Sequence, residues 1–96
     1  MKKQSILNTL FSLKPVVKKR FRAEIRALFG SYAQGNASQE SDVDILVRFE
    51  ESADLFDLVG LSLFLEEKLQ CKVDVVPEDD IRPELKKSIL EEAIYI

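Results

Sequence analysis

Two aspartates stand two positions apart in the segment of residues 41–47. The pair is Asp42 and Asp44, interleaved with Val43 and Ile45. On a strand, both carboxylates would therefore face one side while the apolar side chains enter a core. Close carboxylates repel one another unless a cation lies between them, and a hard divalent ion such as Mg²⁺ takes oxygen ligands of this kind. The pattern predicts a metal site built on a strand.

A third aspartate, Asp74, is flanked by Val73 and Val75, where a charged side chain is costly unless its surroundings need it. If its strand lies beside that of Asp42 and Asp44, three carboxylates converge. Nucleotide-transferring enzymes use a pair of Mg²⁺ ions to clamp the attacking and leaving oxygens. We expect Asp42 and Asp44 to bridge these ions. Asp74 would complete one site and orient or deprotonate the attacking hydroxyl.

A Gly-Ser pair, Gly30 and Ser31, follows an apolar run directly and precedes small and polar residues. This order predicts a strand, a tight turn and a short helix over residues 32–35, with Ser31 as its N-cap and Gly35 at its C-terminal end. Backbone N–H groups in such a turn suit phosphate. We expect Gly30 and Ser31 to hold the terminal phosphates of a nucleoside triphosphate.

Each of these features also has an ordinary structural explanation. The Asp-x-Asp spacing of Asp42 and Asp44 occurs by chance at strand starts, and Gly30-Ser31 could be a plain turn. Asp74 could be a solvated residue of an edge strand. The ordered combination of all three features is more specific than any one of them.

The composition excludes several classes of function. The chain has 96 residues, is 46% hydrophobic and 32% charged, and carries a net charge of −3, which predicts one soluble domain over residues 1–96 and no direct binding of nucleic acid through a basic surface. The absence of histidine excludes a Ser-His-Asp triad and a His-ligated zinc site. A single cysteine cannot form an internal disulfide, and no apolar run approaches the roughly 20 residues that span a bilayer. We therefore expect a cytoplasmic protein that does not bind a membrane.

Hydrophobic periodicity predicts an α/β (α+β) protein in which helices cover a small mixed sheet. A first helix over residues 3–14 would end before Pro15, which would open a second helix. A final helix would bury Leu85, Ile89, Leu90 and Ala93. The expected strands cover residues 24–29, 42–49 and 72–76, and the other helices cover residues 32–35, 54–69 and 83–93.

The chain resembles the minimal nucleotidyltransferases, known as MNT or MntA antitoxins, of the DNA polymerase β-type superfamily. The resemblance covers essentially the whole chain. It is carried by LFGSYAQG at residues 28–35, SDVDILV at residues 41–47 and VDVV at residues 73–76, followed by a final helix.

This resemblance implies a polymerase β-like fold and an ATP- and Mg²⁺-dependent enzyme. Members of the family silence a HEPN-domain toxin, an RNase, by transferring AMP from ATP to a toxin tyrosine. By the resemblance, Asp42 and Asp44 match the metal-binding pair, Asp74 the third catalytic carboxylate, and Gly30 and Ser31 the nucleotide-binding turn. The family often has arginine where this chain has Gln34, and losing that cation predicts a lower affinity for nucleotide.

Two other functions are compatible with the same residues, and a homo-oligomer is compatible with any of the three. The chain could be an antitoxin that neutralises its partner by occlusion without catalysis. It could also be a small-molecule nucleotidyltransferase similar to the aminoglycoside-modifying enzymes, although no substrate domain follows the predicted one. Occlusion should survive Asp44→Asn, whereas catalysis should not.

Overall fold

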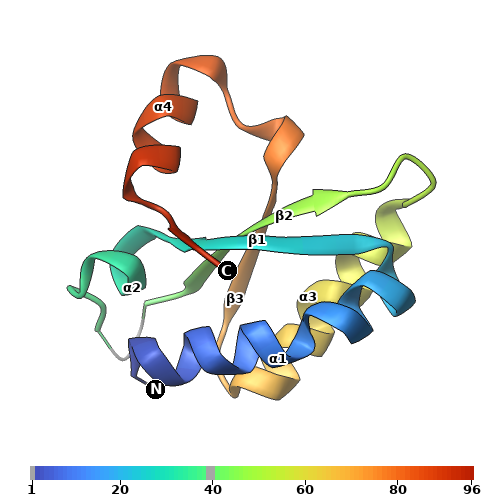
Figure 1. Ribbon diagram of the computed structural model, residues 1–96, viewed down its shortest axis with the longest axis horizontal. Coiled ribbons are helices and arrows are strands. Elements are labelled where there is room, and N and C mark those ends of the chain that lie inside the picture. Colours follow the sequence, from blue (N-terminus) through green and yellow to red (C-terminus); the bar gives the residue numbers. More distant parts are fainter. Residues whose placement is uncertain (1, 39–40) are drawn as a thin grey trace.

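A computed structural model describes residues 2–38 and 41–96 (Figure 1). Helices and strands alternate along the chain, as the periodicity predicts. The elements are α1 (Lys3–Phe21), β1 (Ala23–Phe29), α2 (Gly30–Gln34), β2 (Val43–Phe49), α3 (Leu55–Leu69), β3 (Val73–Pro77), the 3₁₀ helix η1 (Glu78–Asp80), α4 (Pro83–Glu92) and β4 (Ile94–Tyr95).

The four strands form one mixed sheet in the order β3-β2-β1-β4. Strand β1 is antiparallel to both β2 and β4, whereas β2 and β3 are parallel. Parallel neighbours need a crossover connection, and α3 supplies it. The expected mixed α/β fold is confirmed, and the relative directions of the first two strands, which the pattern left undecided, are antiparallel.

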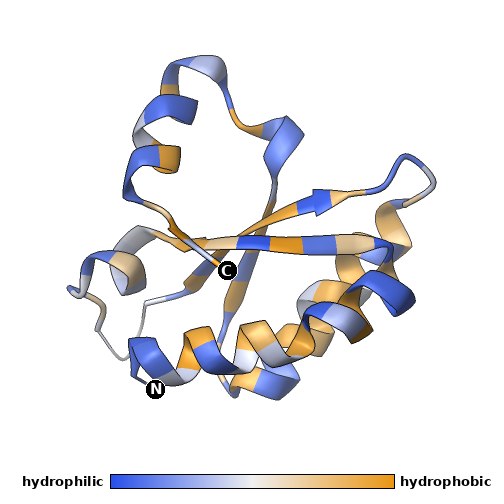
Figure 2. Ribbon diagram, in the orientation of Figure 1, coloured by the Kyte–Doolittle hydropathy of each residue, from blue (hydrophilic) through white to orange (hydrophobic). Residues whose placement is uncertain are grey.

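Helices α1 and α3 cover one face of the sheet, and α4 lies on the other side (Figure 1). Hydropathy colouring shows α3 as largely hydrophobic and α4 as largely hydrophilic (Figure 2). The main core therefore lies between the sheet and the pair α1 and α3. Its buried residues are Ile6, Leu10, Val17, Phe21, Ala23, Ile25, Leu28, Ala33, Val43, Ile45, Val47, Leu61, Leu65 and Leu69. No helix in the described ranges is long and apolar enough to cross a membrane.

The predicted break at Pro15 is wrong, because α1 is one helix of 19 residues that contains Pro15. Its buried residues Ile6, Leu10, Val17 and Phe21 keep the same helical face before and after the proline. Proline inside a helix costs about 3 kcal/mol, mainly through one lost hydrogen bond and a clash. Burial of the continuous stripe offsets that cost here.

Two predictions about the C-terminal part also need correction. No residue of α4 is fully buried, and Leu85, which was expected to face inward, is 51% exposed. Strand β4 was not predicted, because two residues are too few to show a period. It pairs Ile94 with Leu28 and Tyr95 with Ala27, and the Ile96 N–H donates to the Arg26 carbonyl at 2.9 Å.

Candidate active site

Asp44 and Asp74 are direct neighbours across two parallel strands. The register of β2 and β3 pairs Asp44 with Asp74, while Val43 and Ile45 on either side of Asp44 are completely buried. The predicted alternation along this strand is therefore confirmed. Because side chains alternate along a strand, Asp44 lies on the face that α1 and α3 leave uncovered.

Asp42 lies one position before β2 begins, and its side chain is exposed. Burial, followed by the charges of Asp74 and Asp42, raises the pKa of Asp44 to about 6. Asp44 therefore lies within electrostatic reach of both Asp42 and Asp74.

The three carboxylates offer the kind of ligand that Mg²⁺ takes, since Mg²⁺ is commonly held by one or two protein carboxylates together with substrate phosphates and water. Within residues 2–38 and 41–96, no three acidic, histidine or cysteine side chains are gathered closely enough to hold a metal ion by themselves. The donors fit a Mg²⁺ ion that keeps further positions for a nucleotide.

Gly30 forms the wall of the site beside Asp44. It follows Phe29, whose register partner is Asp44, and it has φ 75°, a conformation that glycine adopts without strain. A Cβ at Gly30 would overlap Asp44 Oδ2 and would lie 3.0 Å from its Cγ. The turn thus approaches the carboxylate so closely that only glycine leaves it room.

Helix α2 begins at Gly30, not at residue 32, and Ser31 is inside its first turn. The expectation that Ser31 caps the helix is wrong, because Phe29 is the N-cap and makes no side-chain capping hydrogen bond. Ala33 anchors the helix in the core, and Gly35 ends it with φ 79°, as expected. The N–H groups of the first turn have no partner within the helix.

Gln34 connects the site to the C-terminal helix. Its Nε2 donates a hydrogen bond to Glu92 Oε2 at 2.6 Å, which joins α2 to α4. Sequence spacing does not indicate this contact, because Gln34 and Glu92 are 58 positions apart. Only the fold reveals that Glu92 is the partner of Gln34.

Comparison with known proteins adds to this geometry. The sequence profile of the nucleotidyltransferase domain matches residues 12–96. The chain belongs to this family. Among its relatives is the protein adenylyltransferase MntA of Thermococcus cleftensis, which is 36% identical over 93 residues, or 97% of this chain and 94% of the relative.

Solved structures confirm the fold of this nucleotidyltransferase. A provisionally assigned minimal nucleotidyltransferase superposes with a TM-score of 0.86 and 35% identity, covering 100% of this chain and 97% of the other. A toxin-antitoxin structure with AMP-PNP superposes with a TM-score of 0.69 over 99% of this chain and 72% of the other. At 24% identity, the second match shows the fold alone. Together with the sequence relatives, the first of these structures shows that the chain is an enzyme of the minimal nucleotidyltransferase family.

Proposed function

We propose that this nucleotidyltransferase transfers AMP from ATP to a hydroxyl, that of a tyrosine, on a HEPN-domain toxin, and so acts as the antitoxin of a pair. One structural observation carries the proposal: Asp44 and Asp74 are paired on the open face of the sheet, with the Gly30 turn against Asp44. The named activity of the MntA relative supports a protein acceptor, and the toxin-antitoxin structure with AMP-PNP supports a toxin and a nucleotide.

In the proposed mechanism, Asp42, Asp44 and Asp74 would hold Mg²⁺. Bound Mg²⁺ would neutralise charge on the triphosphate and stabilise the attacking and leaving oxygens. The backbone N–H groups at Gly30 and Ser31 would bind the terminal phosphates, since a helix N-terminus favours anions. These residues would orient ATP so that its α-phosphorus lies near the open sheet face.

Asp74 would orient the acceptor hydroxyl and accept its proton. The hydroxyl oxygen forms a bond to the α-phosphorus, and the bond from that phosphorus to the bridging oxygen of the β-phosphate breaks. Pyrophosphate leaves with the electron pair of the broken bond. Asp74 suits this role because it is exposed, whereas its neighbour Asp44 is partly buried. Orientation of the acceptor hydroxyl and general-base catalysis are thus assigned to Asp74 on β3, and its neighbour Asp44 on β2 is left to hold the metal.

The decisive experiment is AMP transfer to the product of the adjacent gene, because the resemblance implies an antitoxin that is encoded together with its toxin. The two proteins are purified separately and mixed with α-phosphate-labelled ATP and Mg²⁺, and the toxin is then analysed by mass spectrometry and an RNase assay. We expect one or more AMP groups on a toxin tyrosine and loss of RNase activity. Asp44→Asn should abolish both effects, whereas Glu84→Gln, an exposed change on α4, should preserve them.

The same assay distinguishes catalysis from occlusion. If Asp44→Asn still silences the RNase without modifying it, the chain is an occluding antitoxin. If wild-type protein modifies no protein acceptor, the proposed protein substrate is wrong. Labelled AMP on a serine or threonine would keep the reaction and correct the acceptor residue.

A further inference from the structure

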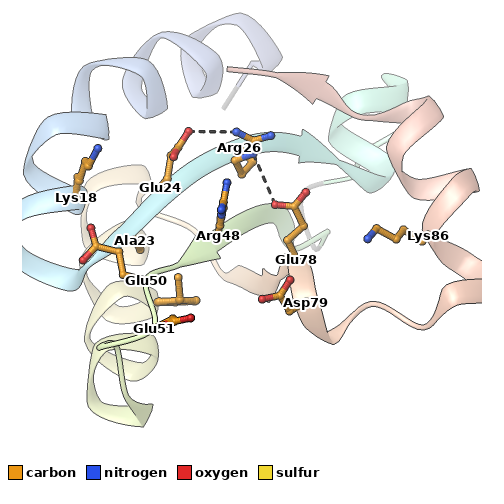
Figure 3. A pocket seen from close by; sticks show the side chains of 11 residues that line it. Lys18, Ala23, Glu24, Arg26, Arg48, Glu50, Glu51, Glu78, Asp79 and Lys86 are labelled. Carbon is orange, nitrogen blue, oxygen red and sulfur yellow. Dashed lines mark hydrogen bonds and ion pairs between the residues drawn. The ribbon is translucent and has the colours of Figure 1, made fainter.

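The open face of the sheet contains a hollow of about 630 Å³ that the proposed chemistry does not use (Figure 3). Glu24 and Arg26 of β1 and Arg48 of β2 form its floor. Glu78 of η1 lies at one side, and Lys86 reaches toward it from α4. The residues that line the hollow are Lys18, Ala23, Glu24, Arg26, Arg48, Phe49, Glu50, Glu51, Glu78, Asp79 and Lys86.

The charges in this hollow are only partly neutralised by one another. Arg26 is paired, because its Nη1 lies 3.2 Å from Glu24 Oε1 and its Nε lies 3.7 Å from Glu78 Oε2. In the part of the chain that the structure describes, Arg48 and Lys86 form no ion pair. The floor and one wall of the hollow therefore each present a cation without a partner.

The hollow lies in line with the proposed catalytic residues. Asp44 and Arg48 are four residues apart on β2, so they share a face of the sheet. At about 3.3 Å per residue, their Cα atoms are separated by roughly 13 Å. Leu46 lies between them on the same face and is completely buried, so an acceptor that contacts both places would pass over the elements that cover Leu46.

A second hollow of about 430 Å³ extends this surface around the end of β2. It shares Phe49, Glu50, Glu51 and Asp79 with the first and adds apolar contacts, including Leu55 and Leu58 at the start of α3. Leu55 is 71% exposed, so its apolar surface can be reached by a partner. The same hollow also adds Asp54 and Asp80, so this end of the surface offers both apolar side chains and carboxylates.

We propose that the two hollows bind the acceptor polypeptide beside its modified residue, with Arg48 and Lys86 binding an acidic side chain of the acceptor. This inference rests on the proposed function and names the part of the enzyme that recognises its protein substrate. The positive and negative side chains that line the hollows together favour a polypeptide as the ligand. Carboxylates of Glu50, Glu51 and Asp79 would repel a nucleic acid or a second nucleotide, whereas a polypeptide can offer both signs of charge and an apolar residue for Leu55.

The test is steady-state AMP transfer to the purified product of the adjacent gene, with Arg48→Glu and Lys86→Glu compared with Lys87→Glu. Lys87 is the matched control because it is exposed on the same helix as Lys86 but does not line either hollow. All three variants change the net charge equally. We expect the KM for the protein acceptor to rise about tenfold or more for Arg48→Glu and Lys86→Glu, as for reversal of a charge at an interface. The Kd for an ATP analogue should stay unchanged.

The outcomes separate this inference from the proposed function. Absence of transfer by the wild-type enzyme refutes both. Transfer with equal KM values for Arg48→Glu, Lys86→Glu and Lys87→Glu refutes only the docking surface. A higher Kd for the ATP analogue with an unchanged acceptor KM would assign the hollow to the nucleotide and also refute it. If the melting temperature of Arg48→Glu is much lower than that of wild type, Arg48→Gln, which keeps a polar side chain of similar reach, replaces it.

Discussion

Asp44 combines burial with two like charges, and this makes the free energy of unfolding depend on pH. Its pKa is raised from 3.8 to about 6 by burial and then by Asp74 and Asp42. Between these pH values the folded state binds more protons than the unfolded state, so stability falls as pH rises from about 4 to about 6. The effect should be of order 1 kcal/mol, because the carboxyl keeps contact with solvent that screens it.

Urea denaturation in EDTA at pH 4.5, 5.5 and 7.0 measures this dependence. The Asp44→Asn variant should show a flatter profile and should be slightly more stable than wild type at pH 7.0. Transfer by this variant and by Asp42→Asn should be abolished. A collapsed thermal melt in either variant would instead assign the aspartate a structural role.

Gly30 and Gly35 offer a matched pair of substitutions at the residue scale. Both have positive φ, so alanine at either position should cost about 1–2 kcal/mol of stability. Only at Gly30 would the added Cβ meet Asp44, because nothing lies within 4 Å at Gly35. Gly30→Ala should therefore displace the carboxylate and lower transfer by about 10²-fold, as a misplacement of about 1 Å can do. Equal activity of the two variants would show that the close approach at Gly30 does not matter.

Substitution of Asp74 should lower the rate of AMP transfer much more than the affinity for nucleotide. Asp74→Asn keeps an oxygen that can accept a hydrogen bond or weakly bind metal, but it cannot take a proton. We expect measurable affinity for ATP and Mg²⁺ with a turnover reduced by about 10²- to 10⁴-fold. Nucleotide binding and labelled AMP transfer, measured for the same variant, provide the comparison. Near-normal transfer would remove Asp74 from the mechanism.

At the scale of elements, local chemistry predicts the start of α3 correctly but not that of α2, whose N-cap is Phe29 and not Ser31. The capping box of α3, in which Asp54 and Asp57 bond each other's N–H groups, forms at the expected start of that helix. Prediction fails where contacts between residues far apart in the sequence decide the structure. The helix passes through Pro15 because its buried stripe continues, and β4 forms only because β1 offers it an edge. The three aspartates were predictable because Asp42 and Asp44 stand at the start of one apolar strand and Asp74 is a charge inside another apolar run. The hollow beside Arg48 could not be predicted from the sequence, because its lining comes from five different parts of the chain.

The contact between α2 and α4 changes the expected consequence of Gln34. Arginine at this position would lie within reach of Glu92, which now accepts the hydrogen bond of Gln34. An exposed ion pair of this kind is worth up to about 1 kcal/mol, so Glu92 would hold much of the added charge away from a nucleotide.

We therefore expect Gln34→Arg alone to change the Kd for ATP little. Combined with Glu92→Gln, the same change should lower that Kd by about fivefold, the equivalent of about 1 kcal/mol. Fluorescent nucleotide binding to the two single variants and the double variant measures the coupling. An identical gain with and without Glu92→Gln would show that this residue does not compete for the cation.

At the scale of the whole molecule, the sheet has two faces with separate tasks. Helices α1 and α3 bury one face in the main core, and the other carries Asp44, Asp74 and the charged hollow. Substitutions on the open face can therefore alter charge without disturbing the main core. This separation is the physical reason to expect folded variants in the experiments above, because removing surface charges far from a core usually changes stability little.

Metal and nucleotide should each strengthen the binding of the other in this fold. The three carboxylates do not gather around one point in the described residues, and Mg²⁺ needs further oxygen ligands that a triphosphate can supply. We expect Mg²⁺ or Mn²⁺ alone to bind weakly, and ATP to bind much more weakly in EDTA than with the metal. Metal and ATP together should raise the melting temperature by more than the sum of their separate shifts, because each ligand completes the site of the other. Calorimetry and thermal melts of wild type and of Asp42→Asn measure this coupling. Tight metal binding without nucleotide, or ATP binding that EDTA leaves unaffected, would contradict a site shared between the carboxylates and the triphosphate.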